Sequence, residues 1–246
     1  MTPKATWTRC GGGILAAATL ALAMGALAPE SDARTDPRIY ALKNGKAKLF
    51  GTKASDWAAQ WWQWALSMPV SANPLFDETG ERVEFGQRGP VWFLGGTFIE
   101  SGQVTRTATI PSGKALFFPI LNYQNDNIPY DPPLTIEEMK EATAILVEGI
   151  DEESLFVTVD DVPVLDLAQG RVASDAFAYA APEGNIGQYF GQNSPRGIYY
   201  PAVTDGYWVM LRPLPLGSHT VHVGGTWGTF VQDFTYNLTV VESNQP

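Results

Sequence analysis

Residues 207–241 read YWVMLRPLPLGSHTVHVGGTWGTFVQDFTYNLTVV, and this stretch decides the fold. It holds three runs with strand character, which are separated by Gly-containing turns: 207–211, 218–223 and 232–241. In the last run, apolar and aromatic residues alternate with threonine and asparagine. An alternation with a period of two residues is typical of a strand with one buried face. The stretch therefore predicts three consecutive strands.

Shorter runs upstream extend this pattern. Residues 91–94 and 114–120 are apolar, and residues 104–110 alternate Val, Arg, Ala and Ile against three threonines. Each run predicts a strand. Residues 184–192 and 194–200 are instead rich in Gly and Asn, which predicts a long loop.

A hairpin is predicted between residues 155–159 and 162–165. The two runs flank Asp160-Asp161, although this pair lacks the glycine that tight hairpin turns favour. Pro163 cannot donate a backbone hydrogen bond, so the second strand is expected at the edge of its sheet.

Two helices stand out from the strands. The first is predicted over residues 56–68, DWAAQWWQWALSM, with Thr52 or Ser55 as its cap and Pro69 at its end. The second opens at Thr135, which forms a capping-box pattern with Glu138 and predicts a helix to about Val147. The first helix has one apolar stripe, which contains Trp57, Trp61, Trp64 and Met68.

Many strands with only two helices predict a mostly β fold. Only 17% of the residues are charged and 12% are aromatic, which also favours strands and turns over long solvated helices. Regular strand–helix alternation, which a Rossmann-type sheet needs, is missing. We expect a single β-rich globular domain over residues 34–246. Its architecture would be an antiparallel β-sandwich or jelly roll, with the two helices packed on it or inserted between strands.

Residues 1–33 have the pattern of a signal peptide. Lys4 and Arg9 precede the apolar run 13–28, which is too short to span a bilayer comfortably. Cleavage is expected after Ala33, which predicts a periplasmic or secreted protein with no stable membrane insertion after cleavage. A retained N-terminal anchor is the alternative. The single cysteine, Cys10, would leave with the signal peptide, and this excludes thiol catalysis and thiolate metal sites in the domain.

The net charge of −10 bears on the choice of partner. A sequence-independent nucleic-acid binder needs a basic surface, so nucleic acid is not expected as a partner. Neutral or cationic partners suit the charge better.

Several longer motifs resemble a group of exported bacterial proteins of unknown function. They cover most of the domain: residues 57–77 (WAAQWWQWALSMPVSANPLFD), 89–97 (GPVWFLGGT), 110–122 (IPSGKALFFPILN), 205–225 (DGYWVMLRPLPLGSHTVHVGG) and 235–240 (TYNLTV). The resemblance implies export and a shared fold but transfers no catalytic residue. It also implies that apolar packing at Val83 and Ala108 replaces a disulfide of the group.

Two features are candidates for a binding site. Trp62 lies about 140° around the helical wheel from Trp57, so we expect it to face a groove or a partner. The segment 122–131, NYQNDNIPYD, is predicted to be a loop, and its oxygen ligands Asn122, Asn125, Asp126, Asn127 and Asp131 would suit calcium. A structural turn without metal is the alternative interpretation. No metal site is assigned and no other cofactor is predicted.

Catalytic motifs are sparse. No Gly-x-Ser-x-Gly pattern occurs, and the odd separation of His219 and His222 sends them to opposite faces of a strand. Paired carboxylates remain open, because a glycosidase needs only two acids at a set separation in space. The candidates are Glu100, Asp126, Asp131 and Asp205.

The first functional hypothesis is a non-enzymatic β-sandwich that binds a glycan or a protein partner through Trp62 and the segment 122–131. The alternative is an extracellular polysaccharide hydrolase or lyase that uses paired carboxylates. A structural component of the cell envelope is a third reading.

Overall fold

The computed structural model describes residues 36–98, 103–128 and 132–243. Contacts group residues 34–246 into one compact unit. The predicted signal peptide lies outside the described residues and stays a prediction. Among the helices of the described residues, none is long and apolar enough to span a bilayer.

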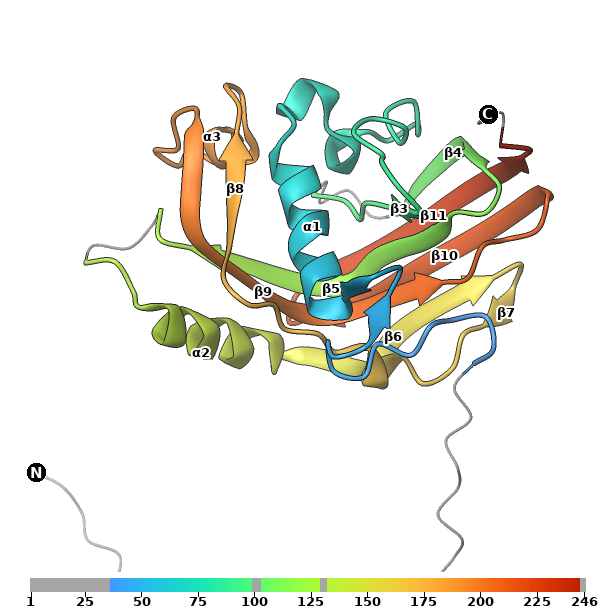
Figure 1. The fold of residues 1–246 in the computed structure, drawn as a ribbon, viewed down its shortest axis with the longest axis horizontal. Helices are drawn as coiled ribbons and strands as arrows, with labels where there is room; N and C mark the ends of the chain where they lie inside the picture. The colour runs from blue at the N-terminus through green and yellow to red at the C-terminus, as the bar shows by residue number, and fades with distance from the viewer. Residues whose placement is uncertain (1–35, 99–102, 129–131, 244–246) are drawn as a thin grey trace, which may run out of the picture. The chain divides into compact units, whose positions relative to one another are not determined.

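Two sheets form the body of this unit, as Figure 1 shows. One has the order β4-β11-β10-β6-β7, and its strands are Val104–Pro111, Phe230–Val241, Gly217–Trp227, Ile150–Val159 and Val162–Pro163. The other has the order β3-β5-β9-β8, and its strands are Val91–Phe93, Ala115–Asp126, Gly197–Leu211 and Phe177–Ala181. A small pair, β1 (Lys48–Leu49) and β2 (Thr52–Lys53), precedes the first helix. The prediction of a mostly β sandwich with few helices is confirmed.

Strand pairing departs from a purely antiparallel sandwich at two edges. β3 joins β5 in parallel, with Val91 opposite Ala115, and β4 joins β11 in parallel, with Val104 opposite Phe234. All the other pairings within these two sheets of the described chain are antiparallel. Since β3 pairs only with residues 115–117, it leaves the second half of β5 without a strand on that edge.

The main core lies between the two sheets. Alternate residues of β4 are buried, as the threonine alternation predicts. The facing strands supply the large apolar side chains of this core, among them Phe118, Ile120, Tyr207, Val209, Val223, Phe234 and Leu238. Most of the stability of the sandwich comes from this removal of apolar surface from water.

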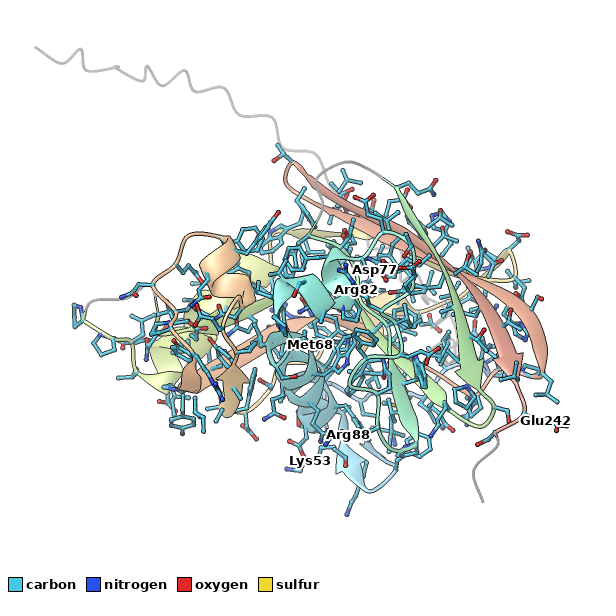
Figure 2. All side chains as sticks on the ribbon, turned by 90° about the horizontal axis from the view of Figure 1, so that it is seen from above. Lys53, Met68, Asp77, Arg82, Arg88 and Glu242 are labelled. Carbon is cyan, nitrogen blue, oxygen red and sulfur yellow. The ribbon has the colours of Figure 1, made fainter. Side chains whose placement is uncertain are left out.

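The first helix, α1 (Ala54–Leu66), covers the opposite face of β5, β9 and β8 (Figure 1). Its amphipathic prediction is confirmed, because Trp57, Trp61 and Trp64 are all buried. The predicted cap is wrong: the N-cap is Lys53 and makes no side-chain hydrogen bond. The helix also stops at Leu66, before Pro69. Figure 2 shows Lys53 and Met68 at opposite ends of the helix.

Short helical turns complete the described chain. The 3₁₀ turns η1 (Val70–Ala72) and η2 (Pro74–Phe76) follow α1, and η3 (Leu167–Gly170) follows β7. The hairpin prediction at Asp160-Asp161 is confirmed, since φ is 53° at Asp160 and 63° at Asp161, as a primed turn requires. Pro163 lies on the edge strand β7 as predicted.

The predicted loop over residues 184–200 is wrong at both ends. A short helix, α3 (Ile186–Tyr189), forms there, and the Asn185 side chain accepts a hydrogen bond from the Gln188 amide. β9 then begins at Gly197, because residues 197–202 pair with β8. Pairing to a neighbouring strand has here overridden local turn preference.

The second helix, α2 (Ile136–Val147), carries the predicted capping box in full. The Thr135 hydroxyl accepts from the Glu138 amide at 3.2 Å, and the Glu138 carboxylate accepts from the Thr135 amide at 2.9 Å. This helix packs against β5 and β9 on the face opposite α1.

We expect Thr135→Ala to lower the free energy of unfolding by about 1 kcal/mol, because the first turn loses its side-chain acceptor. Urea denaturation measures this change. Thr135→Ser keeps the hydroxyl and is the control; an equal loss in both variants would contradict the capping role.

Candidate functional site

A cavity of about 400 Å³ lies along the second half of β5. The elements around it are α1, α3, residues 96–98 and the turn between β10 and β11. Volumes of roughly 300–1,000 Å³ are usual for small-molecule sites. Polar side chains line it from β5 and from the surrounding elements: Asn122, Gln124, Asp126, Thr97, Asn185, Gln192, Ser194 and Gln232. Its aromatic lining is Trp61, Trp62, Phe98, Tyr123, Tyr179, Phe190, Trp227 and Phe230.

Part of the polar lining is a row of three side chains on β5. Asn122, Gln124 and Asp126 are separated by two residues each, so strand geometry directs them to the same face. The sequence prediction of a loop from residue 122 is therefore wrong as far as Asp126. β5 pairs with β9 through its whole length, and Asp126 lies opposite Ala202. The ladder hydrogen bonds hold the Asn and Asp residues in an extended strand despite their turn preference.

Asp126 is held by neutral donors. Its carboxylate accepts from the Tyr179 hydroxyl at 2.7 Å, from the Ile128 amide at 2.9 Å and from the Gln124 amide nitrogen at 3.1 Å. Burial and the negative charge of Asp126 raise the pKa of Tyr179 well above its ordinary value. The Tyr179 phenol is therefore protonated at physiological pH and donates to Asp126.

Asn122 has an unused donor. Its side-chain nitrogen is buried and has no hydrogen-bond partner among the described residues, although the side chain lines the cavity. β9 passes close to Asn122, and the lack of a side chain at Gly206 leaves room for this residue. Gly206 lies opposite with φ of 155°, and a Cβ atom there would come within 2.4 Å of the Asn122 Cβ. A buried donor without a partner is costly, so a hydrogen bond to this atom would be favourable.

Trp62 forms part of the wall and is not on the outer surface. Only 6% of the residue is exposed. Its indole nitrogen donates to the Thr204 hydroxyl at 3.0 Å, and its ring contacts Trp61 edge to face at 5.1 Å. The residue thus lines a groove, and its ring is fixed in place by both contacts.

The aromatic side of the cavity was not visible in the sequence. Phe98, Phe190, Trp227 and Phe230 come from three segments that are far apart along the chain. Phe98 contacts Phe190 at 5.6 Å, and Phe76 of η2 contacts Phe98 at 5.4 Å. Only the folded chain brings these rings together, so no local pattern could have revealed them.

Other predicted residues lie elsewhere or outside the described chain. Asn125 is buried on the opposite face of β5, by strand alternation, and does not line the cavity. Asp205 also lies on that face, where it pairs with Arg171 at 2.9 Å. Asp131 and Glu100 fall outside the described residues.

These positions bear on the paired-carboxylate and calcium hypotheses. Of the described candidate acids, Asp126 lines the cavity and Asp205 does not. Strand alternation likewise separates Asn125 from Asn122 and Asp126, so three of the proposed calcium ligands do not converge. Within residues 36–98, 103–128 and 132–243 there is no cluster of three His, Cys, Asp or Glu side chains that could hold a metal ion.

The two histidines have different partners: His219 pairs with Asp160, and His222 pairs with Asp233.

Fold and site together define a β-sandwich with a small, partly enclosed cavity that has aromatic walls and a row of polar side chains. Comparison with protein-family models, with curated proteins and with solved structures finds no match for this chain. The relationship to the exported bacterial proteins therefore stays a prediction.

Proposed function

We propose that the protein binds a glycan without catalysis and holds one or two sugar units in the cavity beside β5. The observation that supports this proposal most directly is the cavity itself, where aromatic walls face the row Asn122, Gln124 and Asp126. Sugars present apolar ring faces and a rim of hydroxyl groups, and these match aromatic rings and amide or carboxylate groups. Export to the periplasm or beyond, which the sequence predicts, would bring the protein to such a ligand.

The shape of the site favours a small ligand over a protein partner. A protein interface usually buries on the order of 800 Å² per partner on a broad surface. The residues singled out by the sequence, Trp62, Asn122 and Asp126, instead line a cavity of about 400 Å³. Only one candidate acid lines it among the described residues, so the structure adds no support to the paired-carboxylate alternative.

Asn122→Leu tests the proposed function. This variant has nearly the same shape but loses the unused donor, and we expect it to weaken sugar binding about tenfold, the equivalent of one hydrogen bond. Stability should stay the same or rise slightly, because a buried polar atom without a partner is removed. Isothermal titration with a panel of mono- and disaccharides measures the affinity.

Asn237→Leu is the matched control, because Asn237 is exposed on β11 and outside the cavity. It should bind the same sugars as the unmodified protein. If no sugar in the panel gives heat of binding or changes the tryptophan fluorescence, the glycan proposal is wrong.

A further inference from the structure

We propose that the cavity selects a ligand with a protonated amine, and that the glycan it takes carries an amino sugar whose ammonium group binds beside Asp126. This inference rests on the proposed function, since it specifies the ligand class of the same cavity. The juxtaposition that carries it is a carboxylate without a cationic partner inside a cavity with aromatic walls.

The charge of Asp126 is not balanced by the protein. The described residues form five ion pairs, and Asp126 takes part in none of them. Its three hydrogen bonds come from a phenol, an amide side chain and a backbone amide, all of which are neutral. A carboxylate has about four acceptor sites, so one remains for a ligand donor.

No basic side chain lines the cavity in the part of the chain that the structure describes. An anionic ligand would therefore meet a carboxylate with no compensating cation. The net charge of −10 adds a long-range potential of the same sign, which attracts cations and repels anions.

Aromatic rings around the carboxylate add to this preference. Tyr179 donates to Asp126 and is itself stacked on Tyr199, with ring centroids 5.3 Å apart. Burial, and then the negative charge of Asp126, raise the pKa of both phenols, so both stay protonated. Trp62 and Phe190 line the same cavity. Ring faces attract ammonium groups by about 0.5–2 kcal/mol, and they do so most strongly where water is excluded.

An ammonium group also fits this site better than a metal ion does. Calcium takes six to eight oxygen ligands, whereas Asp126 is the one carboxylate among the described cavity-lining residues. A single carboxylate with neighbouring rings and amides is instead a usual environment for a protonated amine.

The test compares glucosamine, glucose and N-acetylglucosamine as probes by isothermal titration at about pH 6, where the sugar amine, with a pKa of about 8 like that of an α-amino group, is protonated. We expect glucosamine to bind about tenfold more tightly than the two neutral sugars. At about pH 9 the amine is neutral, and the preference should disappear.

Asp126→Asn removes the charge and keeps the shape. The new amide can accept from the Ile128 amide with its oxygen, and it can donate to the Tyr179 oxygen and to a rotated Gln124 amide with its nitrogen. The variant should therefore fold, and it should bind all three sugars with similar affinity. Glu141→Gln is the matched control, because it loses the same charge at an exposed position of α2 outside the cavity. It should keep the tenfold preference.

Two results overturn the inference in different ways. Equal affinity of the unmodified protein for the three sugars, or a preference that survives in Asp126→Asn, refutes the amine selectivity and leaves glycan binding intact. Failure of all three sugars and of the wider saccharide panel refutes the proposed function and this inference together.

Discussion

Arg106→Ala is expected to lower the free energy of unfolding by about 3–5 kcal/mol, because it removes a fully buried cation on which several backbone groups depend. Arg106 projects inward from β4 and has no exposed surface. Its guanidinium donates to three backbone carbonyl oxygens: those of Asp77, Gly95 and Gly96. These acceptors would lose their partner in a place that water reaches poorly.

The buried guanidinium is compensated by dipoles and a ring. No carboxylate forms an ion pair with it among the described residues; the Asp77 carboxylate instead accepts from the backbone amides of Thr79, Gly80 and Arg82. Tyr236 accepts from Arg106 at 3.1 Å, and the guanidinium carbon lies 5.4 Å from the centre of its ring. We therefore expect Arg106→Ala to destabilise both β4 and the segment at Gly95-Gly96. This segment leads into the cavity wall at Thr97 and Phe98.

Arg82→Ala provides a matched control in the same part of the fold. Figure 2 shows Asp77 and Arg82 close together. Arg82 is partly exposed and bonds Asp77 through its backbone amide, which the substitution keeps. Its loss of stability should stay within about 0.5 kcal/mol. Urea denaturation of both variants gives the comparison, and a loss below about 1 kcal/mol in Arg106→Ala would refute the structural role of the buried guanidinium.

The position of Arg106 shows why much of the fold can be predicted from the sequence. Strict alternation over residues 104–110 puts Arg106 on the same face as Val104 and Ala108, and that face is buried. The capping box at Thr135 and the hairpin at Asp160-Asp161 depend on interactions between near neighbours, and both are correct. Local patterns succeed where the deciding contacts are themselves local or repeat along one element.

Sequence reasoning was less reliable where distant strands decide the structure. Residues 122–126 and 197–200 contain turn-forming residues, yet both segments lie in strands. Residues 122–126 belong to β5 and pair with β9, whereas residues 197–200 begin β9 and pair with β8. The residues of the candidate site show the same difference between local patterns and contacts from distant segments. Trp62, Asn122 and Asp126 could be singled out as unusual residues, but Phe98 and Trp227 could not, since their role depends on segments that only the fold brings together.

Trp61 is the side chain on which both the second core and the cavity wall depend. It is 2% exposed, and its ring contacts Trp62, Trp64 and Trp208 edge to face at 5.1, 5.8 and 5.6 Å. Its indole nitrogen donates to the Leu94 carbonyl oxygen at 2.9 Å, which ties α1 to the segment after β3. One residue thus connects the helix, the sheet and the ring of Trp62, which lines the cavity.

We expect Trp61→Ala to lower the free energy of unfolding by about 3–5 kcal/mol, the usual cost of removing a buried large aromatic side chain. Trp61→Phe should cost less, because a ring still fills much of the space and only the bond to Leu94 is lost. Urea denaturation gives both values. Near-ultraviolet circular dichroism follows the coupled tryptophan rings.

The comparison with Trp227→Ala separates packing from ligand contact. Trp227 also lines the cavity, is partly exposed and contacts Tyr123 with ring centroids 5.8 Å apart. Its removal should cost less than half as much stability as the removal of Trp61, because less apolar surface returns to water and less cavity is left behind. Both variants remove a cavity-lining ring and should bind sugar more weakly, and Trp61→Ala should in addition lose the fixed position of Trp62. Equal stability losses in the two variants would show that α1 is not anchored through Trp61, and the ordered wall that the glycan proposal needs would then lack its support.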